Sequence, residues 1–271
     1  MSILTRAVIR EKINQSTLMD DIFALMFFRD NIPCVQIMLR VIMGRNDLVV
    51  KSVKVQHVMK AAEGYRYVRL DIYAIDSDNR HYDVEIQVNP EGASPQRARH
   101  NSAMIDVNIL KSGEHYSLLK ERESVVIFIT EKDVLGEGEP IYFIDRVILK
   151  SGKPFNDGSH IVYVNASHQD SETELGRLMH DFHCKKSRDM TDPVFARKSR
   201  EVKGDEEVGV WDEVEAEIEA RGEARGKAIG EARASESIAQ NFIRLGTVAL
   251  DEIAKACGLS LQRVHELAAE K

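Results

Sequence analysis

The sequence is short of cysteine, of long apolar runs and of net positive charge, and each shortage argues against a class of protein. Its three cysteines are widely spaced and include no C-x-x-C pair (Cys34, Cys184 and Cys257), so neither a disulfide framework nor a zinc site is indicated. No signal or lipidation motif opens the chain, and apolar runs such as Val125–Ile129 are far too short to span a bilayer. We therefore expect a cytoplasmic protein with no membrane partner, whose 271 residues can form one sizeable domain with appendages.

The formal net charge of −7 is unusual for a protein that acts on nucleic acid, but the charge is unevenly placed. Residues 205–223 are acidic, whereas basic side chains gather at 97–100, 185–188 and 197–200. Contact with a phosphate needs a local basic patch, not a basic protein. The first cluster is the best candidate because it closely follows a strand-like segment and begins a predicted helix. The other two fit an ordinary solvated surface equally well.

Two alternating strand-like segments, 68–76 and 80–88, are joined by the turn-forming residues 77–79. With a three-residue loop, one face of this hairpin pairs only apolar residues: Val68 with Val88, Leu70 with Ile86, and Ile72 with Val84. The other face pairs Arg69 with Gln87, Asp71 with Glu85, and Tyr73 with Asp83. A two-residue loop would turn Glu85 away from Asp71. The apolar pairing therefore selects the register that sets the two acids side by side.

Two facing carboxylates indicate a cation. Like charges directly opposite each other on a sheet cost about 0.2–1 kcal/mol, and a hard divalent cation with oxygen ligands, Mg²⁺ before Ca²⁺, would remove that cost. The alternative is a half-exposed hairpin whose acids are solvated or paired with Arg69. Both acids lie on the polar face, so we expect that alanine in place of Asp71 or Glu85 leaves no cavity.

Asp71, followed fourteen residues later by Glu85-Ile86-Gln87, resembles the D…(D/E)-x-K motif of the PD-(D/E)XK nuclease superfamily. An ordered series of further segments resembles the PD-(D/E)XK nuclease family transposases, the Rpn-like recombination-promoting nuclease group: 94–106, 125–146, 155–165 and 175–184. The resemblance covers about residues 15–200. It implies a restriction-endonuclease-like α/β core, with a mixed β-sheet flanked by helices. It also implies a DNA endonuclease that depends on Mg²⁺ or Mn²⁺ and is linked to recombination or mobile elements.

The resemblance also implies roles for individual residues. Asp71 and Glu85 would hold one or two cations, and Asp21 on the first core helix would be a further ligand, with its neighbour Asp20 as the alternative. Leu70 stands where the superfamily has proline, which changes little chemically.

Gln87 replaces the lysine of the motif. Its amide could orient the attacking water but adds no positive charge. Arg97 or Arg99 would brace the scissile phosphate through charge-assisted hydrogen bonds. The rival hypothesis is a nuclease-like module that binds DNA or a protein partner without cutting, and an RNA-directed hydrolase is a third.

The remaining pattern predicts a mixed α/β sheet flanked by helices. Capping and turn residues place helices at about 17–28, 31–44, 96–111 and 172–183. Strands are expected at about 48–56, 125–130, 141–149 and 160–165, and the second of these is so apolar that both its faces should be buried. His180, His183 and Cys184 could coordinate a metal in principle, but packing or surface positions on a helix are the favoured interpretation.

The sequence changes character after the nuclease-like domain, which we place at 1–200. Residues 201–235 are a predicted charged helical linker with glycine at 222, 226 and 230. This spacing suits a solvated helix, or two helices that approach closely and join two copies of the chain. Residues 236–271 resemble a helix-turn-helix, with Gly258 at the turn and Ser260 capping the second helix. Gln262, Arg263 and His265 would be its base-reading side chains, beside the unfavourable Glu266.

Overall fold

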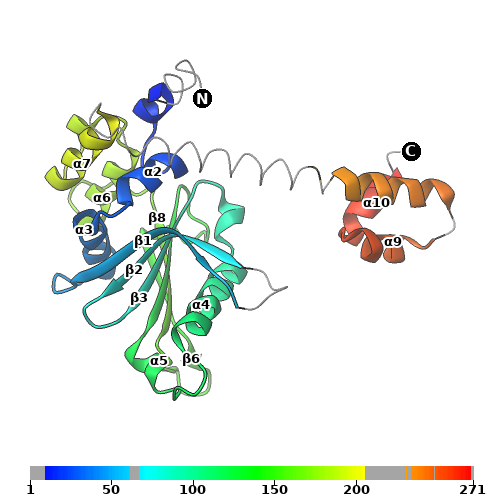
Figure 1. The fold of residues 1–271 in the computed structure, drawn as a ribbon, viewed down its shortest axis with the longest axis horizontal. Helices are drawn as coiled ribbons and strands as arrows, with labels where there is room; N and C mark the ends of the chain where they lie inside the picture. Colours follow the sequence, from blue (N-terminus) through cyan, green and yellow to red (C-terminus); the bar gives the residue numbers. More distant parts are fainter. Residues whose placement is uncertain (1–9, 62–66, 205–229, 231–232, 247, 270–271) are drawn as a thin grey trace. The chain divides into compact units, whose positions relative to one another are not determined.

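A computed structural model describes residues 10–61, 67–204, 230, 233–246 and 248–269 of the chain. The chain divides into two units, Met1–Val208 and Gly209–Lys271. The first unit confirms the predicted α/β class, because it contains a mixed six-stranded sheet flanked by helices (Figure 1).

The strand order in the sheet is β1-β2-β3-β4-β8-β5. The strands β1, β2 and β3 are antiparallel neighbours, β3, β4 and β8 are parallel, and β5 runs antiparallel to β8. Every residue of the central strand β4 is buried, as its apolar sequence predicts. The bounds are β1 Val50–Met59, β2 Val68–Asp76, β3 His81–Gln87, β4 Ser124–Thr130, β5 Ile141–Ile144 and β8 Ser159–Asn165, and β6 Val147–Ile148 pairs separately with β7 Lys153–Pro154.

Helices pack on both faces of the sheet (Figure 1). The long helix α4 Pro95–Ile109 follows β3 and lies against β4, with a core that includes Ile105 and Phe128. The other group is α2 Asp21–Phe28, α3 Ile32–Met43, α6 Glu174–His183 and α7 Pro193–Lys203, joined by packed aromatic rings such as Phe27 and Phe195. Short helical segments complete the unit: η1 Pro90–Ala93, α5 Leu118–Glu121 and η2 Ser187–Asp189.

Local signals in the sequence set several of these boundaries. The Asn31 side chain accepts a hydrogen bond from the Cys34 amide at the start of α3, and Gly44 ends that helix with a φ of 62°, which glycine adopts without strain. Within the described residues no single helix is long and apolar enough to cross a membrane. The helices α2 and α3 would pass that test only as a pair, and they are bent by 109° where they meet.

The predicted register of the β2–β3 hairpin is confirmed where the two strands pair. The ladder runs from Ile72 opposite Val84 to Ile75 opposite His81, and Asn79 makes the turn with a φ of 61°. The alternative of a half-exposed hairpin with solvated acids is wrong, because Glu85 is 0% exposed. Alanine at position 85 would therefore leave a cavity, contrary to the prediction from alternation alone. The predicted division of β2 into an apolar and a polar face is also wrong before Ile72, because Val68 and Leu70 share one buried core with Tyr73 and with residues of α4.

The second unit contains a pair of short helices, α9 Leu250–Cys257 and α10 Leu261–Ala269, as the sequence predicts. Gly258 ends α9 with a φ of 65°, and the Ser260 hydroxyl accepts a hydrogen bond from the Arg263 amide at 3.1 Å. These helices share a small apolar core with the helical residues 233–245. Most of the linker predicted at 201–235, including glycines 222 and 226, lies outside the described residues.

Candidate functional site

Three carboxylates converge where the paired part of the β2–β3 hairpin ends. Asp71 lies on β2 just before the last paired residue, Ile72, and Asp83 and Glu85 lie on β3. Both acids on β3 are 0% exposed. The structure therefore brings together the two predicted acids and adds a third, Asp83, that the sequence reasoning placed on this face but did not assign to the site.

Glu85 is held by three donors. The Arg97 guanidinium forms an ion pair with Oε2 of Glu85, and the Gln87 amide donates to the same oxygen at 3.3 Å. The Asn101 amide donates to Oε1 at 3.4 Å. The positive charge beside Glu85 is thus supplied from α4.

The first turns of α4 present the donors because of how this helix begins. Ser94 caps it by accepting a hydrogen bond from the Arg97 amide, and Pro95 suits the first helical position. Residues four positions apart lie on one face of a helix, so Arg97 and Asn101 point the same way. Arg99 is exposed and faces elsewhere. Of the two arginines predicted from sequence, Arg97 is the one at the site, and it also donates to the Gly92 carbonyl at 2.8 Å and lies 5.7 Å from the Phe128 ring centroid.

Asp71 connects the hairpin to β1 and α2. Its Oδ1 accepts a hydrogen bond from the Gln56 amide at 3.1 Å, and its Oδ2 accepts one from the Ile86 backbone at 3.4 Å. Gln56 has a φ of 52°, a strained conformation for a non-glycine residue within a strand. Asp21 lines the same small hollow as Asp71. The carboxylate of its neighbour Asp20 instead accepts a hydrogen bond from the Thr17 backbone amide at 2.7 Å. Asp21 is therefore the acid of α2 that faces the site.

Gln87 lies beside Glu85, as the two-residue spacing on one strand predicts. A methyl group at Gly92 would collide with the Gln87 amide oxygen. Gly92 therefore provides the space that this side chain occupies, a requirement that the sequence did not reveal.

The site holds more negative charge than its surroundings neutralise. Burial and then the charges of Asp83 and Asp71 raise the pKa of Glu85, although Arg97 opposes the shift. Burial raises the pKa of Asp83, against a hydrogen bond from Asn101 that lowers it. Burial and the charge of Asp21 raise the pKa of Asp71. Among the described residues, the guanidinium paired with these three carboxylates is that of Arg97, so a hard cation with oxygen ligands fits this donor set.

A groove of about 680 Å³ opens beside the carboxylates. Arg97 and Asn101 belong both to the groove and to the site, and the exposed ring of Tyr67 lines its far part. Its remaining lining is mostly polar: Arg69, Glu91, Gly92, Ser94, Gln96 and His100, with Val68. The groove is a polar, partly basic hollow whose lining includes Arg97 and Asn101, two of the side chains that donate to Glu85.

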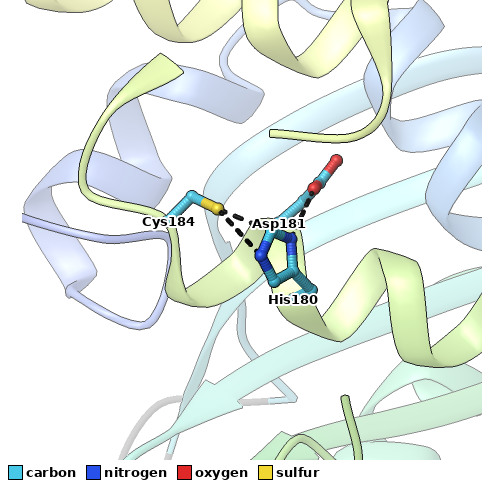
Figure 2. Close-up of side chains that lie close together, drawn as sticks. All are labelled: His180, Asp181 and Cys184. Atoms are coloured by element: carbon cyan, nitrogen blue, oxygen red, sulfur yellow. Dashed lines mark hydrogen bonds and ion pairs between the residues drawn. The ribbon is translucent and has the colours of Figure 1, made fainter. Parts of the chain in front are cut away.

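His180, Asp181 and Cys184 form a second cluster of potential metal ligands (Figure 2). The Asp181 carboxylate is already occupied by donors at the start of α7: the amide of Thr191 at 2.6 Å and its hydroxyl at 3.0 Å, and the amide of Asp192 at 2.9 Å. Burial raises the pKa of Cys184 to about 11, which favours the thiol over the metal-binding thiolate. These contacts support the interpretation of the cluster as helix packing.

The second unit offers few free side chains for base reading. Arg263, the strongest candidate on α10, donates to Glu236 at 2.8 Å and to Glu266 at 3.0 Å. Gln262 donates to the same Glu266 at 3.3 Å. The Arg263–Glu236 pair links α10 to the helical residues 233–245, and the contacts with Glu266 lie within α10. These contacts engage Arg263 and Gln262 and make direct base contact from α10 less favourable.

Comparisons with family models, with curated proteins and with solved structures found no match to this chain. The site is therefore interpreted from its geometry and chemistry. Sequence reasoning missed Asp83, Asn101, Gln56 and Gly92. Only Asp83 carried a usable signal, because it shares a strand face with Glu85.

Proposed function

We propose that this chain is a divalent-cation-dependent nuclease that hydrolyses phosphodiester bonds in DNA. The observation that carries the proposal is a set of three neighbouring carboxylates, Asp71, Asp83 and Glu85. The last two are buried, and among the described residues the arginine paired with this set is Arg97, which also lines a groove. Acids this poorly neutralised cost stability, and a bound cation would remove that cost, which supports a functional cation site.

The arrangement of elements supports a restriction-endonuclease-like core for the first unit. An acid-bearing antiparallel hairpin, β2–β3, is followed by α4 and then by β4, which lies parallel to β3. The helix α2 presents Asp21 beside the hairpin. This is the disposition that the sequence resemblance implies for such a core.

Each side chain has a distinct part in the proposed reaction. Asp71, Glu85 and Asp21 would hold Mg²⁺ or Mn²⁺, which supplies neutralisation of phosphate charge and lowers the pKa of coordinated water. Gln87 orients the attacking water with its amide. Arg97, whose side chain is 36% exposed, extends from the groove to Glu85 and is placed to contact the scissile phosphate.

DNA is the proposed substrate because the groove combines cationic side chains with an exposed aromatic ring. Arg97 and Arg69 can contact the backbone, and Tyr67 offers a stacking surface for a base. Because the protein as a whole carries a net charge of −7, we expect DNA to bind at this groove and not over the wider surface. Contacts between arginine and phosphate would make that binding weaken as the salt concentration rises.

The deciding experiment is a cleavage assay on the full-length protein. Plasmid DNA, single-stranded DNA and RNA are incubated with Mg²⁺, with Mn²⁺ or with EDTA. We expect cation-dependent cleavage of DNA, which Asp71→Asn and Glu85→Gln abolish. These replacements keep the side-chain volume, which matters because Glu85 is buried. Asp78→Asn, on an exposed position of the same hairpin, and Glu121→Gln are matched controls that should cut as wild type does. Cleavage that persists in EDTA or in both site variants would refute the assignment.

The second candidate is a nuclease-like module that binds DNA or a protein without cutting. It is favoured by Glu85 being fully buried and already paired with Arg97, and by Gln87 standing where the motif has lysine. Salt-dependent DNA binding without cleavage under any cation would support it, and cleavage of RNA alone would support the RNA-directed hydrolase.

A further inference from the structure

Asp83 is the acid in the site with no part in the proposed reaction. It lies two residues before Glu85 on the same face of β3 and is 0% exposed. In the described part of the chain no amide, hydroxyl or guanidinium donates to its buried Oδ1 atom, and its carboxyl group lies within hydrogen-bond reach of the Glu85 carboxyl group. A buried carboxylate oxygen left without a donor costs free energy, so packing alone does not account for aspartate at this position.

Asn101 links Asp83 to Glu85. Its amide nitrogen carries two hydrogens, and it donates to Oδ2 of Asp83 at 2.9 Å and to Oε1 of Glu85 at 3.4 Å. Asn101 is itself 2% exposed, so water cannot readily replace either bond. The side-chain amide of Asn101 is oriented with its nitrogen toward both acids. The opposite orientation would place the amide oxygen, which cannot donate a hydrogen bond, against two carboxylate acceptors.

This bridge has two consequences for Glu85. It fixes one oxygen of the Glu85 carboxylate, while Arg97 and Gln87 hold the other. It also keeps a second buried negative charge close to Glu85, which strengthens the attraction for a cation in a region of low dielectric. Asp83 lies deeper in the protein than the groove, whose lining includes Asn101 but not Asp83. Its effect is therefore exerted through its neighbours.

We infer that Asp83 and Asn101 are positioning residues of the cation site, which fix the Glu85 carboxylate and raise the affinity of the site for a divalent cation. The inference rests on the proposed function, because it assumes that Asp71 and Glu85 bind the cation. It adds a third acid and an amide whose removal weakens cation binding without removing a ligand.

Asp83→Asn tests the inference, because it keeps the shape and the acceptor for Asn101 while it removes the charge. Mg²⁺ binding by the full-length protein is followed by calorimetry and by the rise of Tm with Mg²⁺ concentration, with no nucleic acid present. We expect Mg²⁺ affinity to fall on the order of ten-fold, and the Tm in EDTA to stay the same or rise as the repulsion is relieved. Asn101→Ala, which removes the bridge by another route, should also weaken Mg²⁺ binding.

Cleavage at increasing Mg²⁺ provides an independent readout. Both variants should need more Mg²⁺ for half-maximal activity and should approach the wild-type rate when Mg²⁺ is saturating. Asp76→Asn, at another buried acid of the same hairpin, is the control and should lower the Tm without changing the Mg²⁺ dependence. Unchanged Mg²⁺ affinity in both variants would overturn the inference while leaving the proposed function in place. No Mg²⁺ binding by wild type would overturn both.

Discussion

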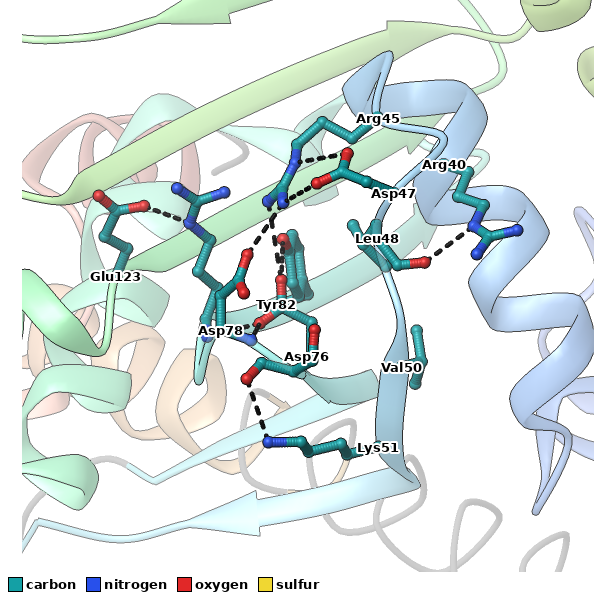
Figure 3. Close-up of polar contacts among 12 residues, drawn as sticks. Arg40, Arg45, Asp47, Leu48, Val50, Lys51, Asp76, Asp78, Tyr82 and Glu123 are labelled. Carbon is teal, nitrogen blue, oxygen red and sulfur yellow. Dashed lines mark hydrogen bonds and ion pairs between the residues drawn. The ribbon is translucent and has the colours of Figure 1, made fainter.

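Acidic side chains lie at both ends of the β2–β3 hairpin, and the two groups differ in how fully neighbouring donors and cations neutralise them. At the turn, Asp76 is 1% exposed, and both oxygens of its carboxylate accept hydrogen bonds (Figure 3). Its Oδ1 accepts hydrogen bonds from the amides of Asp78 and Arg80, both at 2.9 Å. Its Oδ2 accepts one from the Tyr82 hydroxyl at 2.9 Å and lies 3.9 Å from the Arg45 guanidinium. This acid organises the turn.

At the other end, Asp71, Asp83 and Glu85 are brought together with more negative charge than the described cations beside them neutralise. They share one guanidinium, and one oxygen of Asp83 has no donor in the described residues. The comparison teaches how to separate a structural buried acid from a functional one. We propose that a structural acid has both carboxylate oxygens occupied by hydrogen-bond donors, whereas an acid of a functional site keeps unsatisfied charge that a ligand can use.

Asp181 supports the same distinction outside the hairpin. It accepts three hydrogen bonds from Thr191 and Asp192 and fixes the start of α7. By this criterion Asp181 belongs with Asp76, although His180 and Cys184 lie close to it. Proximity of potential ligands is a weaker signal than unsatisfied charge.

The largest expected effect concerns Asp76. Asp76→Ala removes the acceptor of two backbone amides and of the Tyr82 hydroxyl, and should lower the free energy of unfolding by about 3–5 kcal/mol. Denaturant unfolding measures this change. Asp47→Ala, which removes an exposed partner of the same Arg45, is the control and should change stability little. A small effect of Asp76→Ala would contradict the proposed distinction, because a fully hydrogen-bonded buried acid would then contribute no more to the free energy of unfolding than an exposed acid does.

The next largest effect is expected on cleavage rate, from replacing Gln87. This residue donates to Glu85 at the end of the hairpin opposite the turn, called here the open end. If its amide orients the attacking water, Gln87→Ala should slow cleavage about 100-fold while the protein stays folded. Gln87→Lys should retain measurable activity, because an ammonium can also contact water and phosphate. Gly92→Ala should resemble Gln87→Ala, since the added methyl group displaces the Gln87 amide.

Kinetics of these variants are compared with those of Gln15→Ala, at an exposed position outside the site. Equal rates for wild type and Gln87→Ala would remove Gln87 from the mechanism and leave the role of the carboxylates untouched.

The hairpin also shows which features a sequence can predict. The alternation of apolar residues predicted the register in the paired part of the hairpin. The motif spacing predicted that Asp71, Glu85 and Gln87 are site residues. Both predictions depend only on residues that are neighbours within one hairpin. The apolar sequence of β4 predicted its burial for the same local reason.

Features that depend on distant segments were not predicted. Alternation could not show that α4 covers the polar face, so the burial of Glu85 was missed and its replacement by alanine was wrongly expected to leave no cavity. The bridge from Asn101 spans sixteen residues to Glu85 and exists only because α4 packs on β3. The contact of Gln56 with Asp71 depends on a left-handed backbone conformation that no local residue preference indicates. The restriction-endonuclease-like identity of the core stays a prediction.

The smallest effect we predict is a pH dependence of stability that originates at the open end of the hairpin. Burial raises the pKa of Asp83 and of Glu85 above their ordinary values of 3.8 and 4.5. The folded protein therefore holds these protons more tightly than the unfolded chain does. The resulting stabilisation is complete below the ordinary values and is lost as the pH rises through the raised ones.

In EDTA, the stability of wild type should fall between about pH 4 and about pH 7 relative to that of Asp83→Asn, by an amount on the order of 1 kcal/mol, because the pKa of Asp83 is raised from 3.8 to about 7. Comparison with the variant cancels the contribution of groups that both proteins share, including His57 and His81, whose pKa values are lowered by burial and act in the opposite direction. Saturating Mg²⁺ should reduce the difference, because a bound cation favours the ionised carboxylates at every pH in this range. Parallel stability curves for the two proteins in EDTA would mean that Asp83 is as well neutralised as Asp76, and the contrast between the two ends of the hairpin would then be lost.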